Sequence, residues 1–188
     1  PEETRRVPKL LADYGIRLVL LEALQGTRVD GACFWINGKA PAIALSLRFD
    51  RIDHFWYVLG HELGHIKHRD GAALRVLDID LVGDKESRDG EKPENERAAD
   101  QLAIEMAVPG NELRSFINRT RPLYSKTKIA MFAARIGVHP GLVVGQLQHL
   151  GEIQYAHHRG FLTKVRNSVA SSTLTDGWGN IPPSLARA

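Results

Sequence analysis

Residues 61–65 read His-Glu-Leu-Gly-His, an HExxH pattern within a segment, residues 51–69, whose apolar positions keep helical spacing. In a helix of 3.6 residues per turn, positions four apart lie on one face, so both imidazoles leave the helix together. Two imidazoles on one face are typical of a pair of ligands for one zinc ion, with Glu62 placed beside them as a general base. We therefore expect a buried, motif-bearing helix with Asp50 or Asp53 as its N-cap.

A catalytic zinc ion needs three protein ligands and one open position, so the motif is one ligand short. The segment Glu96-Arg97-Ala98-Ala99-Asp100 offers two carboxylates four residues apart, again on one helix face. We expect Glu96 to bind the metal and Asp100 to accept the second ring N–H of a ligand histidine, most readily His61. The small Ala99 would permit close approach of the two helices.

These segments resemble the ImmA/IrrE family of zinc metallopeptidases. The HELGH segment is similar to the active-site helix of that family, and residues 96–103 followed by Met106-Ala107-Val108-Pro109 resemble its second-helix pattern. The resemblance covers about residues 10–150. It departs from the family pattern at Leu102, where the family usually has Phe, and at Val108, where it usually has Met, and both replacements remain apolar.

The resemblance implies an α+β, zincin (gluzincin-like) fold in which His61, His65 and Glu96 bind Zn²⁺ and Glu62 acts as the base. It also implies a metallopeptidase whose substrate is a protein, in this family a helix-turn-helix repressor of stress responses or mobile elements. A repressor-like domain before Pro1 is a further implication. The residues leave the metal open, because a His-His-carboxylate set also suits Mn²⁺ or Fe²⁺.

The remaining pattern predicts a small, mostly antiparallel sheet packed on the HExxH helix. A first helix ends at Gly15, and apolar runs at 16–21, 32–36 and 42–47 predict three strands. Asn37-Gly38 between the last two is a strong hairpin signal. We also expect the strand at 42–47 to lie at a sheet edge, where an extended substrate segment could add as a further strand.

Helices at about 111–118, 125–136 and 140–150 predict a helical C-terminal part. We divide the chain into a metallopeptidase core (1–112), a basic helical subdomain (113–166) and a flexible tail (167–188), with an exposed loop at 83–95. The subdomain has nine basic residues and one acid, Glu152, whereas residues 1–112 have 15 basic and 20 acidic residues. Together with a loose helix-turn-helix pattern at 129–147, this charge makes a nucleic-acid contact conceivable, although a packing role is favoured.

Composition restricts the class of protein further. No apolar run approaches the roughly 18 residues of a membrane span, so no membrane partner is expected. The single cysteine, Cys33, cannot form an internal disulfide, and no signal peptide is recognisable, so we expect a buried, inert thiol in a cytoplasmic protein.

Several alternatives stay open from the sequence. The oxyanion-stabilising group could be Tyr124, Tyr155, His139, His157 or His158. His68 follows the motif, but the metzincin pattern HExxHxxGxxH requires Gly at that position, so we interpret it as a solvated residue at the helix end. A different function, an antitoxin-like transcriptional regulator that keeps the metal site with little or no turnover, fits the same residues.

Overall fold

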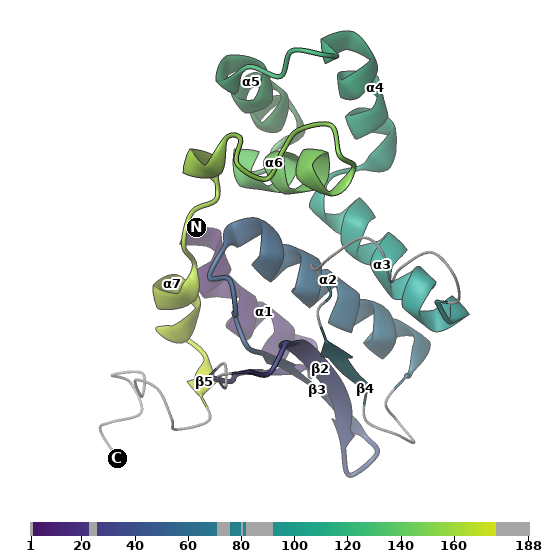
Figure 1. Cartoon of the computed structure of the whole chain (residues 1–188). Coiled ribbons are helices and arrows are strands. Elements are labelled where there is room, and N and C mark those ends of the chain that lie inside the picture. Colours follow the sequence, from purple (N-terminus) through teal and green to yellow (C-terminus); the bar gives the residue numbers. More distant parts are fainter. Residues whose placement is uncertain (1, 23–25, 71–75, 80, 82–91, 176–188) are drawn as a thin grey trace.

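The computed structural model describes residues 2–22, 26–70, 76–79, 81 and 92–175. The helices and strands follow one another in the order shown in Figure 1: η1 Glu2–Arg6, α1 Val7–Asp13, β1 Arg17–Leu20, β2 Val29–Ile36, β3 Ala40–Leu45, α2 Ile52–His68, β4 Val76–Ile79, α3 Glu94–Ala107, α4 Gly110–Thr120, α5 Lys126–Ile136, α6 Pro140–His149, η3 Arg159–Phe161, α7 Arg166–Ala170 and β5 Leu174–Thr175. The fold is α+β, as predicted.

The sheet is mixed rather than mostly antiparallel. Its strand order is β4-β2-β3-β1-β5, with β2 antiparallel to β3 and β4, and β1 parallel to β3 and β5. The hairpin prediction is confirmed, since Asn37 and Gly38 have φ values of 51° and 68°, as a tight β2–β3 turn requires. The prediction of antiparallel pairing was wrong for β1, because its partners are not its neighbours in sequence.

The predicted edge strand at 42–47 is also wrong. β3 lies between β2 and β1 and is hydrogen-bonded on both sides, so no substrate segment can add to it. Its side chains confirm this interior position, because Ala42, Ile43, Ala44 and Leu45 are all buried. The alternation of polar and apolar residues that marks a strand with one solvent-facing side is absent from this sequence, and the continuous apolar run is typical of a strand covered on both faces.

α2 packs on the sheet and begins without the predicted cap. The N-cap position is Arg51, and neither Asp50 nor Asp53 caps α2. The Asp50 carboxylate instead accepts the backbone N–H groups of Val165 and Arg166, at 3.0 and 2.7 Å, at the start of α7. Asp53 is paired with Arg51. The prediction failed because these carboxylates have long-range and side-chain partners that local sequence does not show.

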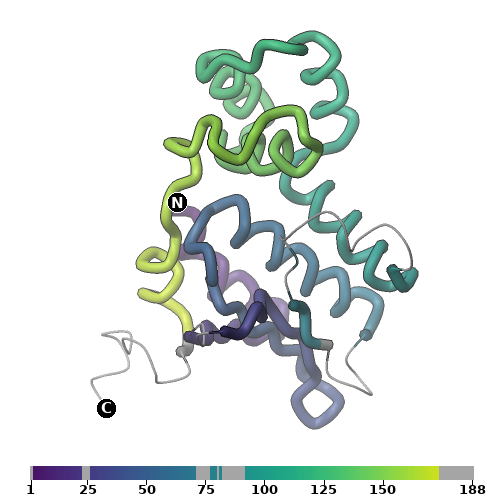
Figure 2. Tube along the Cα trace, in the orientation of Figure 1, coloured from purple at the N-terminus to yellow at the C-terminus, as the bar shows by residue number. Residues whose placement is uncertain are grey.

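Two apolar clusters form the core. The first lies between α1, the sheet and α2, and the second joins the end of α3 to α4, α5 and α6, the helical part in the upper region of Figure 1. Trp56 on α2 packs against both clusters. The tube in Figure 2 shows the chain returning from the helical part to the sheet through residues 163–175.

This return corrects the predicted flexible tail at 167–188 for the residues that the structure describes. Val165 and Val169 are buried in the first cluster, and β5 pairs with β1. The tail was predicted from its polar composition, but the buried Val169 and the pairing of β5 with β1 attach residues 167–175 to the core. Residues 176–188, and most of the predicted loop 83–95, lie outside the described residues. Among the helices described, none combines the length and apolar character needed to cross a membrane.

Candidate metal centre

The HExxH helix places two imidazoles at one point. His61 and His65 are both fully buried, and their Nε2 atoms lie 3.0 Å apart. Each Nδ1 atom faces a carboxylate: Asp100 Oδ1 lies 3.0 Å from His61 Nδ1, and Asp70 Oδ2 lies 3.1 Å from His65 Nδ1. A ring N–H donated from Nδ1 leaves the lone pair on Nε2, so two lone pairs converge where a cation would sit.

α3 approaches α2 closely enough for Glu96 to reach both imidazoles. A Cβ atom added to Gly64 would lie 2.6 Å from Ala99 Cα, and one added to Gly60 would lie 2.9 Å from Ala103 Cα. The expected role of Ala99 is confirmed, because the helices meet backbone to backbone there. One turn earlier, Glu96 places its carboxylate oxygens 3.4 Å from His61 Nε2 and 3.4 Å from His65 Nε2.

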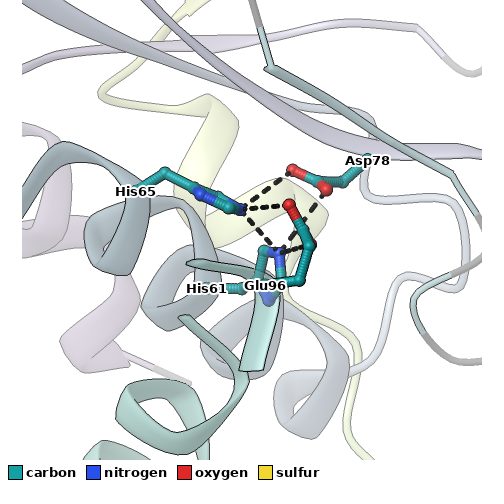
Figure 3. Close-up of side chains that lie close together, drawn as sticks. All are labelled: His61, His65, Asp78 and Glu96. Carbon is teal, nitrogen blue, oxygen red and sulfur yellow. Dashed lines mark hydrogen bonds and ion pairs between the residues drawn. The ribbon is translucent and has the colours of Figure 1, made fainter. Parts of the chain in front are cut away.

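Asp78 on β4 is a fourth group that we did not predict. Its Oδ1 lies 3.5 Å from His61 Nε2 and its Oδ2 lies 3.9 Å from His65 Nε2. Figure 3 shows the side chains of His61, His65, Asp78 and Glu96 directed at one another. One atom from each lies within 4.8 Å of the others. A weak signal was present, since Asp78 is a single carboxylate within the otherwise apolar segment Val76–Ile79.

Hydrogen bonds beyond the four groups hold them in place. Asp100, which we predicted to accept a ring N–H of His61, also accepts from the Tyr57 hydroxyl at 2.7 Å and from the Lys92 ammonium. Asp70, which accepts from His65, was missed by the sequence analysis. It follows α2 directly, after Arg69 in the left-handed conformation, and no pattern identifies such a turn residue as a histidine partner.

The charged groups of this cluster shift one another's pKa values. Burial opposes protonation of His61, but hydrogen bonds with Asp100, Asp78 and Glu96 outweigh it and raise the pKa of His61 to about 11. Burial likewise opposes ionisation of Asp100, yet its hydrogen bonds with His61, Lys92 and Tyr57 hold the pKa of that carboxyl well below its ordinary value. A positive charge among these donors, which a proton or a metal ion supplies, is therefore favourable.

Glu62 lies beside the cluster without entering it. Its side chain is fully buried, and neither carboxyl oxygen has a hydrogen-bond partner among the described residues. It packs against Gly31 of β2, where an added Cβ atom would clash with Glu62 Oε1. Burial first, and then the charge of Asp78, raise the pKa of Glu62 well above its ordinary value. An unpartnered buried carboxyl group is unfavourable unless function requires it.

These observations test whether a metal ion fits. Two imidazole lone pairs and two carboxylates converge, each imidazole is oriented by a second carboxylate, and Asp78 Oδ2 is buried with no hydrogen-bond partner in the described part of the chain. Nitrogen and carboxylate oxygen donors in this number suit Zn²⁺ and similar divalent ions. The site fits a metal ion through His61, His65, Glu96 and Asp78.

Comparison with known families agrees with this geometry. The family model described as the IrrE N-terminal-like domain, Peptidase_M78, matches residues 12–147. The chain belongs to the Peptidase_M78 family. The match extends from α1 to α6 and includes the HExxH helix and α3, and membership implies a metallopeptidase. A comparison with curated proteins found no significant match.

The other candidate residues from the sequence are not among the four groups of the metal centre. His68 is exposed at the last position of α2, as expected. Tyr124 donates to Glu152 Oε2 at 2.6 Å, and His139 Nδ1 accepts the Gly141 N–H at the start of α6. The oxyanion-stabilising role of any of these groups, or of Tyr155, His157 or His158, stays a prediction.

The loose helix-turn-helix pattern corresponds to α5, a turn at Gly137 and α6. Most of α6 is buried, including Val143, Val144 and Leu147, which have no exposed surface. α6 therefore has no free face to enter a DNA groove, and its position favours packing. A nucleic-acid contact elsewhere in residues 113–166 stays a prediction.

Proposed function

We propose that this M78 domain is a zinc-dependent endopeptidase that hydrolyses a peptide bond in a protein substrate. The observation that carries the proposal is the convergence of two oriented, fully buried imidazoles with Glu96, beside a buried Glu62 whose carboxyl oxygens have no partner among the described residues. In this proposal His61, His65 and Glu96 hold the ion. The bound ion would act as a Lewis acid that polarises the scissile carbonyl and acidifies water.

The protein's own groups provide the proton transfers. Glu62 accepts a proton from the attacking water and delivers it to the leaving amine, which its unpartnered oxygens permit. Asp100 and Asp70 hold the imidazoles in one tautomer and one orientation. Tyr57 and Lys92 fix Asp100 in turn, so the position of His61 depends on groups from α2, α3 and the segment before α3.

We propose a DNA-binding transcriptional repressor as the substrate. The support is the resemblance of the HELGH and second-helix segments to the ImmA/IrrE family. In this proposal the substrate is a separate protein that is cut in the cytoplasm.

A regulatory module without turnover is a second candidate function. The observation that favours it is Asp78, which faces the same point as the three proposed ligands and offers a fourth ligand there. This candidate predicts metal binding without hydrolysis.

Replacement of Glu62 by Gln separates the two candidates. Zinc-loaded wild-type protein is incubated with a co-expressed repressor, and product formation is followed by mass spectrometry. Because Gln keeps the size of the side chain but cannot accept the proton, we expect Glu62→Gln to retain zinc and to lose at least about 10²-fold in hydrolysis rate. Glu94→Gln, at an exposed position of α3, is the matched control and should cleave at the wild-type rate. Equal rates for Glu62→Gln and wild type would contradict the peptidase mechanism.

A further inference from the structure

We propose that Asp78 is the fourth ligand of the metal ion and occupies the coordination position that hydrolysis needs for water. The M78 domain is then latent as folded, and turnover requires the Asp78 carboxylate to leave the ion. This inference rests on the metal binding of the proposed function but not on its peptidase activity.

Several distances among the four groups are close to those between ligand atoms of a tetrahedral site. With metal–ligand bonds of about 2.0–2.1 Å, two ligand atoms of a tetrahedron lie about 3.3–3.4 Å apart. The imidazole nitrogens lie 3.4 Å from the Glu96 oxygens and 3.5 and 3.9 Å from the Asp78 oxygens. Asp78 therefore approaches the common point almost as closely as Glu96 does.

The burial of Asp78 is an independent reason to assign it as a metal ligand. Asp78 is 5% exposed, and its Oδ2 has no hydrogen-bond partner among the described residues. Its neighbours include the carboxyl groups of Glu62 and Glu96, which repel it, as well as the imidazole of His61, whose Nε2 lies 3.5 Å from Asp78 Oδ1. A buried carboxylate with one oxygen left without a partner is costly, and a divalent ion between His61, His65, Glu96 and Asp78 would compensate its charge.

The sheet directs this carboxylate inward. β4 pairs antiparallel with β2, and Asp78 lies opposite Gly31, the residue against which Glu62 packs. Alternation along the strand leaves Leu77 and Ile79 more than half exposed, on the other face from Asp78. Asp78 and Glu62 thus share one small region beside Gly31.

Ligand number is what distinguishes structural from catalytic zinc. Structural sites are closed by four protein ligands, whereas catalytic sites use three and keep one position open. With Asp78 bound, the site has the closed set, and Glu62 has no water to deprotonate. With Asp78 withdrawn, the same site has the open set. Asp78 therefore competes with water for the ion, and the proposal predicts metal binding without turnover as long as Asp78 is bound.

Cobalt substitution tests the ligand number without an activity measurement. Co²⁺-loaded wild type, Asp78→Ala and Asp78→Asn are compared by visible absorption and titrated with acetohydroxamate, a small chelator that needs an open position. We expect Asp78→Ala to bind acetohydroxamate at least about tenfold more tightly than wild type, with a changed Co²⁺ spectrum. Asp78→Asn keeps the shape of the side chain, so it controls for a folding defect caused by the smaller alanine. It should behave like Asp78→Ala because an amide is a weak ligand.

Asp70→Ala is the matched control, since it removes a carboxylate from the Nδ1 side of His65. It should weaken Co²⁺ binding without opening a position for acetohydroxamate. Equal acetohydroxamate affinities in wild type and both Asp78 variants would overturn the proposal. That result is distinct from failure of the proposed function, which would appear as equal hydrolysis by wild type and Glu62→Gln.

Discussion

At the residue scale, the position of Glu62 depends on the missing side chain of Gly31. Gly31 has room for the Glu62 carboxyl group only because it lacks a side chain: an added Cβ atom would clash with Glu62 Oε1 and lie 2.8 Å from Val58 Cγ1. The proposed general base, Glu62, is therefore positioned by a glycine from another element. The HExxH pattern contains Glu62 but not the surface against which Glu62 packs.

Gly31→Ala should displace the base while sparing the ligands. Because the clash involves the flexible end of Glu62, we expect the protein to fold and to bind zinc, with hydrolysis reduced by about 10²-fold. Zinc affinity from chelator competition and peptide-bond cleavage are measured on the same samples. Gly160→Ala, where an added methyl group meets nothing within 4 Å, is the control. Unchanged cleavage by Gly31→Ala would show that Gly31 does not position Glu62.

Cys33 gives a pH prediction at the same scale. The thiol is fully buried, and burial, followed by the charges of Glu62 and Asp78, raises its pKa to about 12 from an ordinary value of 9.0. Since the folded state favours the protonated thiol, its contribution to stability is complete below pH 9 and decreases as pH rises toward 12. At pH 8 only about one thiol in 10⁴ is ionised, so iodoacetamide should not label the folded protein. Labelling in urea is the positive control, and equal rates with and without urea would refute the prediction.

Close contact between α2 and α3 determines the site at the scale of elements. Four small residues, two on each helix at four-residue spacing, let the backbones meet: Gly60, Gly64, Ala99 and Ala103. Histidines from α2 and Glu96 from α3 can reach one ion only at this separation. The second glycine of this set belongs to the HELGH segment, so the motif encodes a packing surface as well as ligands.

Gly64→Ala should separate the helices. The added Cβ atom would lie 2.6 Å from Ala99 Cα, a backbone atom that cannot move without shifting α3. We expect a loss of about 1–3 kcal/mol in the free energy of unfolding and weaker zinc binding, because Glu96 moves with α3. Urea unfolding in EDTA and a zinc titration measure the two effects, with Gly160→Ala again as the control. A stable variant with wild-type zinc affinity would contradict this account of the α2–α3 contact.

At the scale of the whole molecule, long-range contacts join residues 163–166 to the segment between β3 and α2. The Ile52 N–H at the start of α2 donates to the Thr163 carbonyl at 2.9 Å, and Arg166 donates to the carbonyls of Ser46 and Leu47. Together with Asp50, these groups attach the start of α7 to the segment between β3 and α2. The start of the motif-bearing helix is thus held by residues more than a hundred positions later in the chain.

Asp50→Ala tests this attachment. Loss of the Asp50 carboxylate leaves the N–H groups of Val165 and Arg166 without their acceptor, and Asp50 has a φ of 46°, which alanine tolerates poorly. We expect the free energy of unfolding to fall by about 1–3 kcal/mol. Asp50→Asn keeps an acceptor oxygen and tolerates this φ, so it should lose clearly less. Chemical denaturation measures both variants, and equal losses would contradict the hydrogen-bonding role.

The sequence by itself determined the local features, because each depends on residues close together in the chain. HExxH places two imidazoles on one helix face, Glu96 and Asp100 share a face of the next helix, and Asn37-Gly38 forces a tight turn between β2 and β3. Helical spacing also located α4, α5 and α6. Packing of α2 against α3 could be anticipated from Ala99, since small residues permit close approach.

Only the tertiary structure decided which distant groups meet. The position of β3 inside the sheet, the parallel pairing of β1, the attachment of residues 165–175 and the place of Asp78 all depend on contacts between segments far apart in sequence. Asp78 lies in a four-residue strand that was not predicted from the sequence, and local sequence does not give the direction of its carboxylate relative to the histidines. Local periodicity fixes which face a side chain occupies, whereas the partner across that face is set by the global arrangement of the chain.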